Sequence, residues 1–194
     1  MAAPQIILAS SSPYRRRLLE RLGLPFTAVS PDIDERPQAH ETPPATVERL
    51  AVSKAQVVCG QYPKALVIGA DQLAVHDGQI VGKPHDHTEA VQQLHTASGG
   101  AVTLYTGVAL INSETSRVQS AVVPFRVVFR QLSDSQIENY LRREQPYDCT
   151  GAVKAEGLGI ALLERMEGDD PSALIGLPLI RLVRMLEKEG INVV

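Results

Sequence analysis

The stretch that decides the fold is residues 6–19, IILASSSPYRRRLL. An apolar run of strand length is followed by serines, a proline and arginines, and leucines then recur at helical spacing. This order predicts a strand, a tight loop and a helix start, with Ser12 as the N-cap and Pro13 at the first helical position. The N–H groups at such a helix end can bind an anion, which Arg15 would also face. Taken alone, the segment is equally compatible with an ordinary capped helix whose arginines are solvated.

Composition limits the classes of protein to consider. The chain has 194 residues, of which 44% are hydrophobic, so it can bury a substantial core. Its net charge of −3 gives no global basic field, which favours a small anion over a nucleic-acid polymer as ligand. Cys59 and Cys149 lack metal-ligand spacing, which argues against a disulfide framework or structural zinc. Without a signal-peptide pattern or an apolar run of about 18 residues, we expect a cytoplasmic protein with no membrane partner.

A group of carboxylates follows the second expected strand. Residues 26–29 predict that strand, and the acids after it include Asp34 and Glu35. The proline-rich segment 36–44 then predicts a loop, able to move over a site. The acids therefore fall at a strand end, with a solvated acidic loop as the alternative.

A second carboxylate, Asp71, follows the clearest buried strand pattern in the chain, residues 65–70. The carboxyl edge of an open α/β sheet is where ligands bind. A hairpin turn at residues 77–78 indicates that extended structure continues past Asp71, so a helix cap is not its role.

Three basic or glycine-rich segments are candidates for ligand contact. Lys54 lies on or beside the apolar stripe of a helix opening at residues 42–43, and its ammonium either snorkels to solvent or enters a cleft. Lys83 follows the hairpin without the pattern of a P-loop, but it remains a candidate phosphate contact. Residues 147–159 carry three glycines with Glu156 among them, which either bring the backbone close to a ligand or turn a corner.

The remaining patterns complete the prediction of an α/β fold. They predict three helices, at residues 88–97, after the capping box of 133–136, and from 179 to Gly190. They also predict strands at 101–112, 117–130 and 160–163. Residues 167–172 are expected to form a turn. His85, His87 and His95 show no metal-binding spacing. With no repeat or linker, we expect one α/β domain over residues 1–194, a mixed twisted sheet with flanking helices, arranged as two lobes around a cleft.

Seven motifs span nearly the whole chain in order: Leu8-Ala9-Ser10-x-Ser12-Pro13-x-Arg15, Asp34-Glu35, the Lys54 helix, Gly69-Ala70-Asp71, Gly82-Lys83-Pro84, residues 151–159, and Gly176-Leu177-Pro178-Leu179. Together they resemble the Maf nucleotide pyrophosphatases. The resemblance implies a fold similar to the inosine-triphosphate pyrophosphatases and a metal-dependent cut between the α and β phosphates of a nucleoside triphosphate.

The resemblance and the residue chemistry assign the same roles. The phosphates, with about four negative charges, would meet Ser10, Ser12, Arg15, Lys54 and Lys83. Glu35 and Asp71 would hold Mg²⁺ or Mn²⁺, which binds through one or two carboxylates and phosphate oxygens. Asp71 is also the best general base for the attacking water, and the two roles compete because a metal lowers the pKa of its ligand.

Three positions inside the motifs carry information on the base. The dTTP/UTP subgroup of the family has arginine, threonine and glutamine where this chain has Tyr14, Gln72 and Glu156, and these three resemble the 7-methyl-GTP pyrophosphatase subgroup instead. Tyr14 is a departure, because an indole is common there. We expect Tyr14 to stack on the base and Glu156 to bind its donor edge, while Gln72 either bonds O6 or shapes the pocket.

The resemblance therefore implies hydrolysis of 7-methyl-GTP to 7-methyl-GMP and diphosphate, which removes a modified nucleotide. One alternative is a pyrophosphatase for dTTP/UTP or other canonical nucleotides. Another is a nucleotide-binding regulator of septum formation without turnover. The sequence does not set the oligomeric state, and a homodimer is compatible with it.

Overall fold

The computed structural model describes residues 4–194, which divide into two compact units built from interleaved segments. Unit 1 contains the described residues up to Gln72, together with Tyr105–Val123 and Asp170–Val194. Unit 2 contains Leu73–Leu104 and Pro124–Asp169. The chain passes between the units within three of its strands, so neither unit is a continuous piece of sequence.

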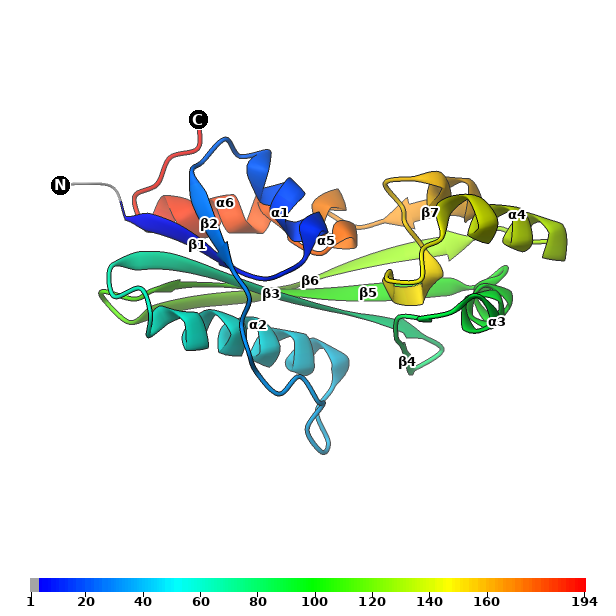
Figure 1. The fold of residues 1–194 in the computed structure, drawn as a ribbon, viewed down its shortest axis with the longest axis horizontal. Helices are drawn as coiled ribbons and strands as arrows, with labels where there is room; N and C mark the ends of the chain where they lie inside the picture. Colours follow the sequence, from blue (N-terminus) through cyan, green and yellow to red (C-terminus); the bar gives the residue numbers. More distant parts are fainter. Residues whose placement is uncertain (1–3) are drawn as a thin grey trace. The chain divides into compact units, whose positions relative to one another are not determined.

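The strands form a mixed seven-stranded sheet, as the sequence predicts, in the order β2-β1-β3-β5-β6-β7 with β4 on β3 (Figure 1). β1 is parallel to β2 and β3, whereas the β3–β4 and β6–β7 pairs are antiparallel. The strands are β1 Gln5–Ala9, β2 Phe26–Val29, β3 Ala65–His76, β4 Gln79–Val81, β5 Ala101–Asn112, β6 Arg117–Phe129 and β7 Leu163–Glu167.

The helices are α1 Pro13–Glu20, α2 Pro43–Cys59, α3 His87–Ala97, α4 Asp134–Glu144, α5 Pro171–Ile175 and α6 Leu179–Lys188, with short 3₁₀ helices η1 Thr150–Ala152 and η2 Leu158–Leu162. Among the described residues, every α-helix except α6 begins after an N-cap residue whose side chain accepts from a backbone amide of the first turn. Ser12 caps α1 by accepting from the Arg15 amide, and Ser133 and Gln136 form the predicted capping box of α4.

In unit 1, successive side chains along a strand point to opposite faces of the sheet, so they pack into two separate hydrophobic cores. Ile6 and Leu8 of β1 pack in the core with residues of α1 and α6, whereas Ile7 and Ala9 pack in the core with residues of α2. Figure 1 shows α2 on one face of β1 and β3, with α1 and α6 on the other. A Cβ at Gly69 would collide with the backbone carbonyl of Ala51, so glycine lets α2 lie close against β3.

In unit 2, the predicted hairpin joins β3 to β4. Asp77 and Gly78 have φ angles of 46° and 77°, the left-handed conformation of the two-residue turn that the sequence indicates. The segment 147–159 is fastened to α4, since Glu144 accepts from the Leu158 amide at 2.7 Å and from Lys154 Nζ at 2.9 Å. Gly159 has no room for a side chain beside the Lys154 carbonyl, so here glycine serves close packing within the loop.

Two sequence predictions of local structure are wrong. Residues 160–162 belong to η2, and the strand begins only at Leu163, which pairs with Phe129. A short apolar run does not distinguish a strand from a helical turn. The turn expected at 167–172 contains the start of α5, because Asp170 caps that helix through the Ser172 amide and Pro171 occupies its first position.

Candidate active site

The loop between β1 and α1 is shaped by its own serines. β1 ends at Ala9, opposite Gly69 of β3. Ser10 is buried, and its Oγ accepts from the Ser12 amide at 3.1 Å, while Ser12 Oγ accepts from the Arg15 amide at 3.4 Å. Both predicted phosphate-contact serines therefore shape the loop at the N-terminus of α1 by accepting from backbone amides.

Arg15 is half-buried and held by the backbone. Its Nε donates to the carbonyl of Gly176 at 2.9 Å. Burial lowers the pKa of Arg15 from its usual value, and the negative charges of Asp71 and Glu35 oppose this shift. An arginine keeps its charge at neutral pH despite such a shift. The guanidinium is thus a fixed cation near the two predicted carboxylates.

Lys54 links those two carboxylates. Its Nζ lies 2.7 Å from Asp71 Oδ1 and 3.0 Å from Glu35 Oε1. The Lys54 and Asp71 side chains are only 6% and 9% exposed, whereas Glu35 is 58% exposed. Lys54 therefore points inward from α2 and does not snorkel to solvent. A buried ammonium needs such partners because leaving it unpaired is costly.

The topology explains why these residues meet. Asp71 lies two positions beyond Gly69, the partner of the last residue of β1, so β1 no longer covers it. β2 ends at the same level of the sheet, since Val29 pairs with Ala9, and the loop after β2 supplies Glu35. β3 itself continues to His76, so the prediction that Asp71 lies within extended structure is confirmed.

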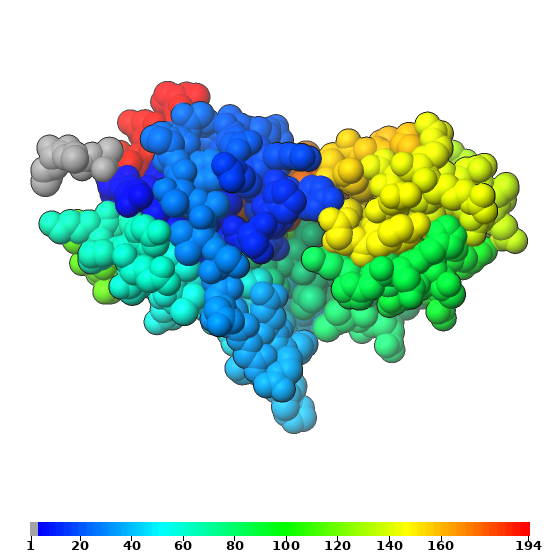
Figure 2. Space-filling model, viewed as in Figure 1, coloured from blue at the N-terminus to red at the C-terminus, as the bar shows by residue number. Residues whose placement is uncertain are grey.

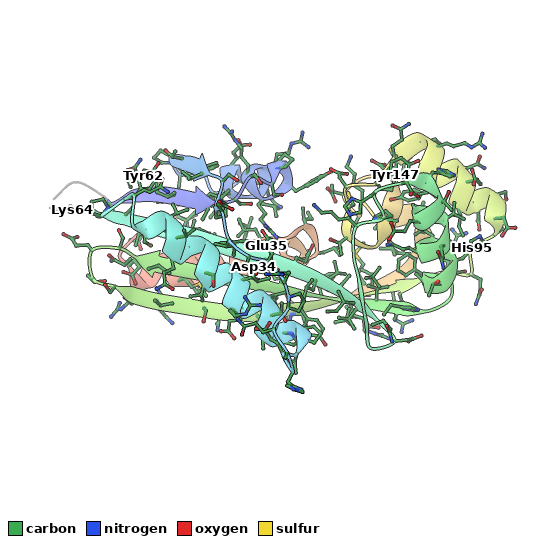
Figure 3. All side chains as sticks on the ribbon, turned by 60° about the horizontal axis from the view of Figure 1, so that its bottom comes forward. Asp34, Glu35, Tyr62, Lys64, His95 and Tyr147 are labelled. Carbon is green, nitrogen blue, oxygen red and sulfur yellow. The ribbon has the colours of Figure 1, made fainter. Side chains whose placement is uncertain are left out.

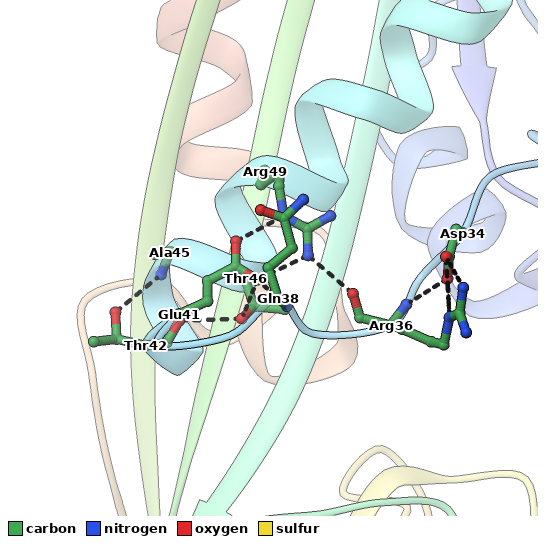
Figure 4. A network of polar contacts seen from close by, with 8 residues as sticks. All are labelled: Asp34, Arg36, Gln38, Glu41, Thr42, Ala45, Thr46 and Arg49. Carbon is green, nitrogen blue, oxygen red and sulfur yellow. Dashed lines mark hydrogen bonds and ion pairs between the residues drawn. The ribbon is translucent and has the colours of Figure 1, made fainter.

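The loop that carries Glu35 is tied down on α2 (Figure 4). The Glu41 carboxylate receives Nε and Nη2 of Arg49 at 2.6 and 2.8 Å, the Thr46 hydroxyl at 3.0 Å and the Gln38 amide at 3.1 Å. The Arg49 guanidinium is the main reason that the pKa of Glu41 falls to about 2.

Nearer to Glu35, Asp34 accepts from Arg36, whose carbonyl accepts from Arg49 at 3.2 Å. Asp34 and Glu35 follow each other on the segment leading to α2 (Figure 3), and the light-blue region around residue 40 stands out from the surface of unit 1 (Figure 2). This exposed loop thus holds Glu35 through an ion-pair network at its base.

Glu35 and Asp71 are two carboxylates that could bind a cation at this site. Within residues 4–194, no group of three or more His, Cys, Asp or Glu side chains is placed to hold a metal ion. Glu35 and Asp71 are a pair, which is the number of carboxylates that Mg²⁺ uses when phosphate oxygens and water complete its shell. Asp71 Oδ1 contacts Lys54, while Oδ2 accepts no hydrogen bond from the described part of the chain. The residues therefore fit a divalent cation that is bound together with a nucleotide.

Gln72, the next residue on β3, is engaged through one end of its amide. Its Nε2 donates to Thr106 Oγ1 at 2.9 Å and to the Ala173 carbonyl at 2.8 Å. Tyr14 is half-buried on α1. Both belong to unit 1, like the phosphate and carboxylate candidates described above.

Lys83 and Glu156 belong to unit 2, where both are exposed. Their loops are joined, because the Gly151 amide donates to the Gly82 carbonyl at 3.1 Å and the His85 amide to the Tyr147 carbonyl at 3.1 Å. The second of these loops, drawn in yellow, forms part of the visible surface in Figure 2. Within unit 2 the structure thus brings together the two segments that carry Lys83 and Glu156.

The sequence did not point to three parts of this arrangement. Thr106 is a buried threonine in an ordinary strand pattern, and the Gly176 carbonyl contacts Arg15 from a loop 161 positions away in sequence. Thr106 leaves no local signal, and Gly176 stood out only as part of the motif at residues 176–179, which does not indicate its contact with Arg15. The Glu41–Arg49 pair joins neighbouring segments, because the helix of Arg49 follows the loop directly. The two residues are eight positions apart, however, and charge pairs are recognised in a sequence at the helical spacings of three or four.

Comparison with known proteins places the chain in a protein family. The family described as Maf-like protein matches residues 5–189. The chain belongs to this family. Proteins named 7-methyl-GTP pyrophosphatase from Nitrosococcus oceani and Pseudomonas aeruginosa are each 56% identical to it, over 97% and 98% of this chain and 95% and 99% of their own lengths. One of the same name from Methylobacillus flagellatus is 54% identical over 98% of this chain and all of its own.

The comparison agrees with the family resemblance seen in the motifs. A separate observation concerns membranes: none of the helices within residues 4–194 has the length and apolar character required to span a bilayer.

Proposed function

We propose that this protein is a nucleoside triphosphate pyrophosphatase that hydrolyses 7-methyl-GTP to 7-methyl-GMP and diphosphate. The observation that carries the proposal is the buried Lys54, which joins Asp71 and Glu35 near Arg15, in a chain of the Maf family. The names of relatives that are 51–56% identical over nearly the full chain support the choice of substrate.

The phosphate chemistry follows from the charges. Arg15, held by Gly176, and the N-terminus of α1 would position the phosphates, with Lys54 and Lys83 as further cations. Glu35 and Asp71 would hold Mg²⁺ or Mn²⁺, which supplies neutralisation of the charge that develops on the leaving diphosphate. Positioning and charge stabilisation are the main contributions that a protein makes to phosphoryl transfer.

The general base is assigned to Asp71. Its Oδ1 is held by Lys54, so its Oδ2 is the oxygen that would either take a proton from water or bind the cation, two roles that compete for one atom. The water oxygen then bonds to phosphorus, the phosphorus bond to the bridging oxygen breaks, and the proton passes to the carboxylate. Lys54 would fix the orientation of the carboxylate during this step.

The base is read by Tyr14, Gln72 and Glu156 in this proposal. Methylation at N7 gives guanine a positive charge, so the ring of Tyr14 gains a cation–π contribution of roughly 0.5–2 kcal/mol over plain stacking. An ionised Glu156 accepts the N1–H and 2-amino donors of guanine with charge assistance. The exposure of Glu156 in unit 2 leaves its carboxylate available for such a contact.

The proposal also includes conditions that the sequence suggests. We place the protein in the cytoplasm, acting as one domain on a small nucleotide, with no nucleic-acid polymer or membrane partner, and we leave a homodimer open. The composition motivates this location.

The deciding experiment is a panel of 7-methyl-GTP, GTP, UTP and dTTP, assayed for diphosphate and monophosphate release with and without Mg²⁺. The expected result is metal-dependent release of both products, with the highest kcat/KM for 7-methyl-GTP. A preference for UTP or dTTP would favour the canonical-nucleotide alternative. Binding without turnover of any nucleotide would favour a regulator.

A further inference from the structure

The orientation of the Gln72 amide is fixed by groups that can only accept. Nε2 donates to the backbone carbonyls of Ala173 at 2.8 Å and Leu174 at 3.2 Å. A carbonyl oxygen has no hydrogen to donate, so the NH₂ end of the amide, and not its oxygen, must face α5. Gln72 therefore directs its only donor group into the protein.

Thr106 confirms the direction of this network. It is fully buried in β5, and its Oγ1 donates to the Ala173 carbonyl at 2.8 Å. A hydroxyl has a single hydrogen, so toward Gln72, 2.9 Å away, Thr106 Oγ1 can only accept. One threonine and two carbonyls of α5 thus hold the amide nitrogen from several sides.

The other end of the amide is left for a ligand. Gln72 Oε1 accepts no hydrogen bond from residues 4–194, and it is not among their fully buried, unpartnered polar atoms. It lies 3.9 Å from the point that a Cβ on Gly176 would occupy, and Arg15 Nε lies 3.5 Å from the same point. Gly176, with φ of +120°, therefore keeps the space beside both groups clear.

We propose that Thr106 is a positioning residue that holds Gln72 as an acceptor-only contact for the nucleoside part of the substrate. This inference rests on the proposed function, because it assigns the polarity of one contact in that site. A phosphate oxygen and the guanine O6 are acceptors, so Gln72 in this orientation can bind neither. Its partner must be a donor, either an N–H group of the base or a hydroxyl of the ribose.

The test deletes donors from the substrate one at a time. The kcat/KM of wild type is measured for 7-methyl-GTP and for its analogues that lack the 2-amino group, carry a methyl at N1, or lack the 2′- or 3′-hydroxyl. The analogue without the partner donor should lose about 2- to 12-fold, the value of one neutral hydrogen bond, and it identifies base or ribose as the source. A site that leaves a polar group unpaired discriminates in this way.

The same panel on Gln72→Met assigns the contact. Methionine approximates the length of glutamine but has no acceptor of comparable strength, so the discrimination seen in wild type should shrink by the share of one hydrogen bond for that analogue alone, while any discrimination due to Glu156 persists. Discrimination that persists unchanged in Gln72→Met would overturn the inference, and so would a wild type indifferent to all four donors.

Thr106→Val and Thr106→Ser separate positioning from general structural support. Valine keeps the shape and removes the hydroxyl, and should weaken the same discrimination, while serine should restore it. A purely structural role would lower kcat/KM for all substrates by the same factor, and this result would overturn the role of Thr106. Circular dichroism checks folding, and if the valine variant does not fold, Thr106→Ala takes its place: weakened discrimination in Thr106→Ala supports the role and wild-type discrimination opposes it.

Failure of the proposed function looks different from failure of this inference. A wild type that releases no diphosphate from 7-methyl-GTP would overturn both. Hydrolysis of 7-methyl-GTP with ratios that do not respond to Gln72→Met would overturn only the acceptor assignment.

Discussion

The charged residues assigned to the substrate are held very differently in the two units. In unit 1, Lys54 contacts Asp71 and Glu35 within 3.0 Å, and Arg15 donates to a backbone carbonyl. In unit 2, Lys83 and Glu156 are exposed, and neither forms an ion pair with any residue in the described part of the chain. Only the backbones of their loops are joined to each other.

The charged side chains assigned in unit 1 are paired and partly buried, whereas those in unit 2 are exposed to solvent. The charges of unit 1 are paired with one another within the protein, so removal of one buried partner leaves the other without compensation and should lower stability as well as activity. The charges of unit 2 are hydrated, and substitutions at such positions usually change stability by less than about 0.5 kcal/mol. Mutations in the two units should therefore give two distinct sets of consequences.

The largest effect is expected from Asp71→Asn. The substitution keeps the volume of the side chain and removes the charge needed for base or metal-ligand function, so kcat should fall by more than about 100-fold. Steady-state kinetics on 7-methyl-GTP measure the loss, and circular dichroism should show an intact fold. A variant with near wild-type kcat would contradict the assignment of Asp71.

The comparison between units is tested most directly by Lys54→Met and Lys83→Met. Removing Lys54 leaves the buried Asp71 without its closest cation, so the free energy of unfolding should fall by about 3–5 kcal/mol. Lys83→Met, on the exposed loop, is the matched control and should change it by less than about 0.5 kcal/mol. Urea denaturation of both variants provides the measurement. Equal losses would show that the two units do not differ as described.

Arg15→Ala and Lys83→Ala should share one effect although they lie in different units. Both side chains are assigned to phosphates, which all nucleotides carry, so kcat/KM should fall about tenfold or more for every triphosphate tested. The order of preference among bases should stay as in wild type. A fall in kcat/KM for nucleotides of one base alone would show that the substituted residue contacts the base, and its assignment to the phosphates would be wrong.

Glu156→Gln and Tyr14→Ala should instead change the preference. An amide both donates and accepts, so Glu156→Gln should reduce discrimination for 7-methyl-GTP over UTP. Tyr14→Ala should remove the cation–π contribution, a change of about 2- to 30-fold in the ratio for 7-methyl-GTP over GTP. Ratios of kcat/KM over the four nucleotides decide the matter. Ratios unchanged in both variants would oppose their role in reading the base but leave the pyrophosphatase proposal standing.

Much of the fold follows from local signals. The strand, serine loop and capped helix of residues 5–20 are as the sequence predicts, and so are the hairpin at 77–78 and the capping box of α4. These features depend on neighbouring residues, which a sequence displays. The strand predicted at 160–163 is wrong because a short apolar run does not distinguish a strand from a helical turn, and residues 158–162 form η2.

The site shows the same limit at longer range. Lys54 and Asp71 were predicted from their patterns, but the choice between an exposed and a buried Lys54 depended on a partner on another element. The direction of the Gln72 amide depends on Thr106 and on α5, 34 and about 100 positions later in the chain. Only the folded chain shows which end of an amide is left for a ligand.

The smallest effect is expected at Glu41, which keeps the Glu35 loop in place. Its folded-state pKa of about 2 lies below the ordinary value of 4.5, so Glu41 contributes stability above pH 4.5 that is lost as the pH falls toward 2. Glu41→Gln should be less stable than wild type at pH 7, because Arg49 loses its charged partner, and its stability should fall less steeply between these two pH values. Urea denaturation across this range measures both slopes, with Glu164→Gln on exposed β7 as the control that should match wild type. A Glu41→Gln slope equal to that of wild type would mean that the Glu41–Arg49 pair does not hold the loop.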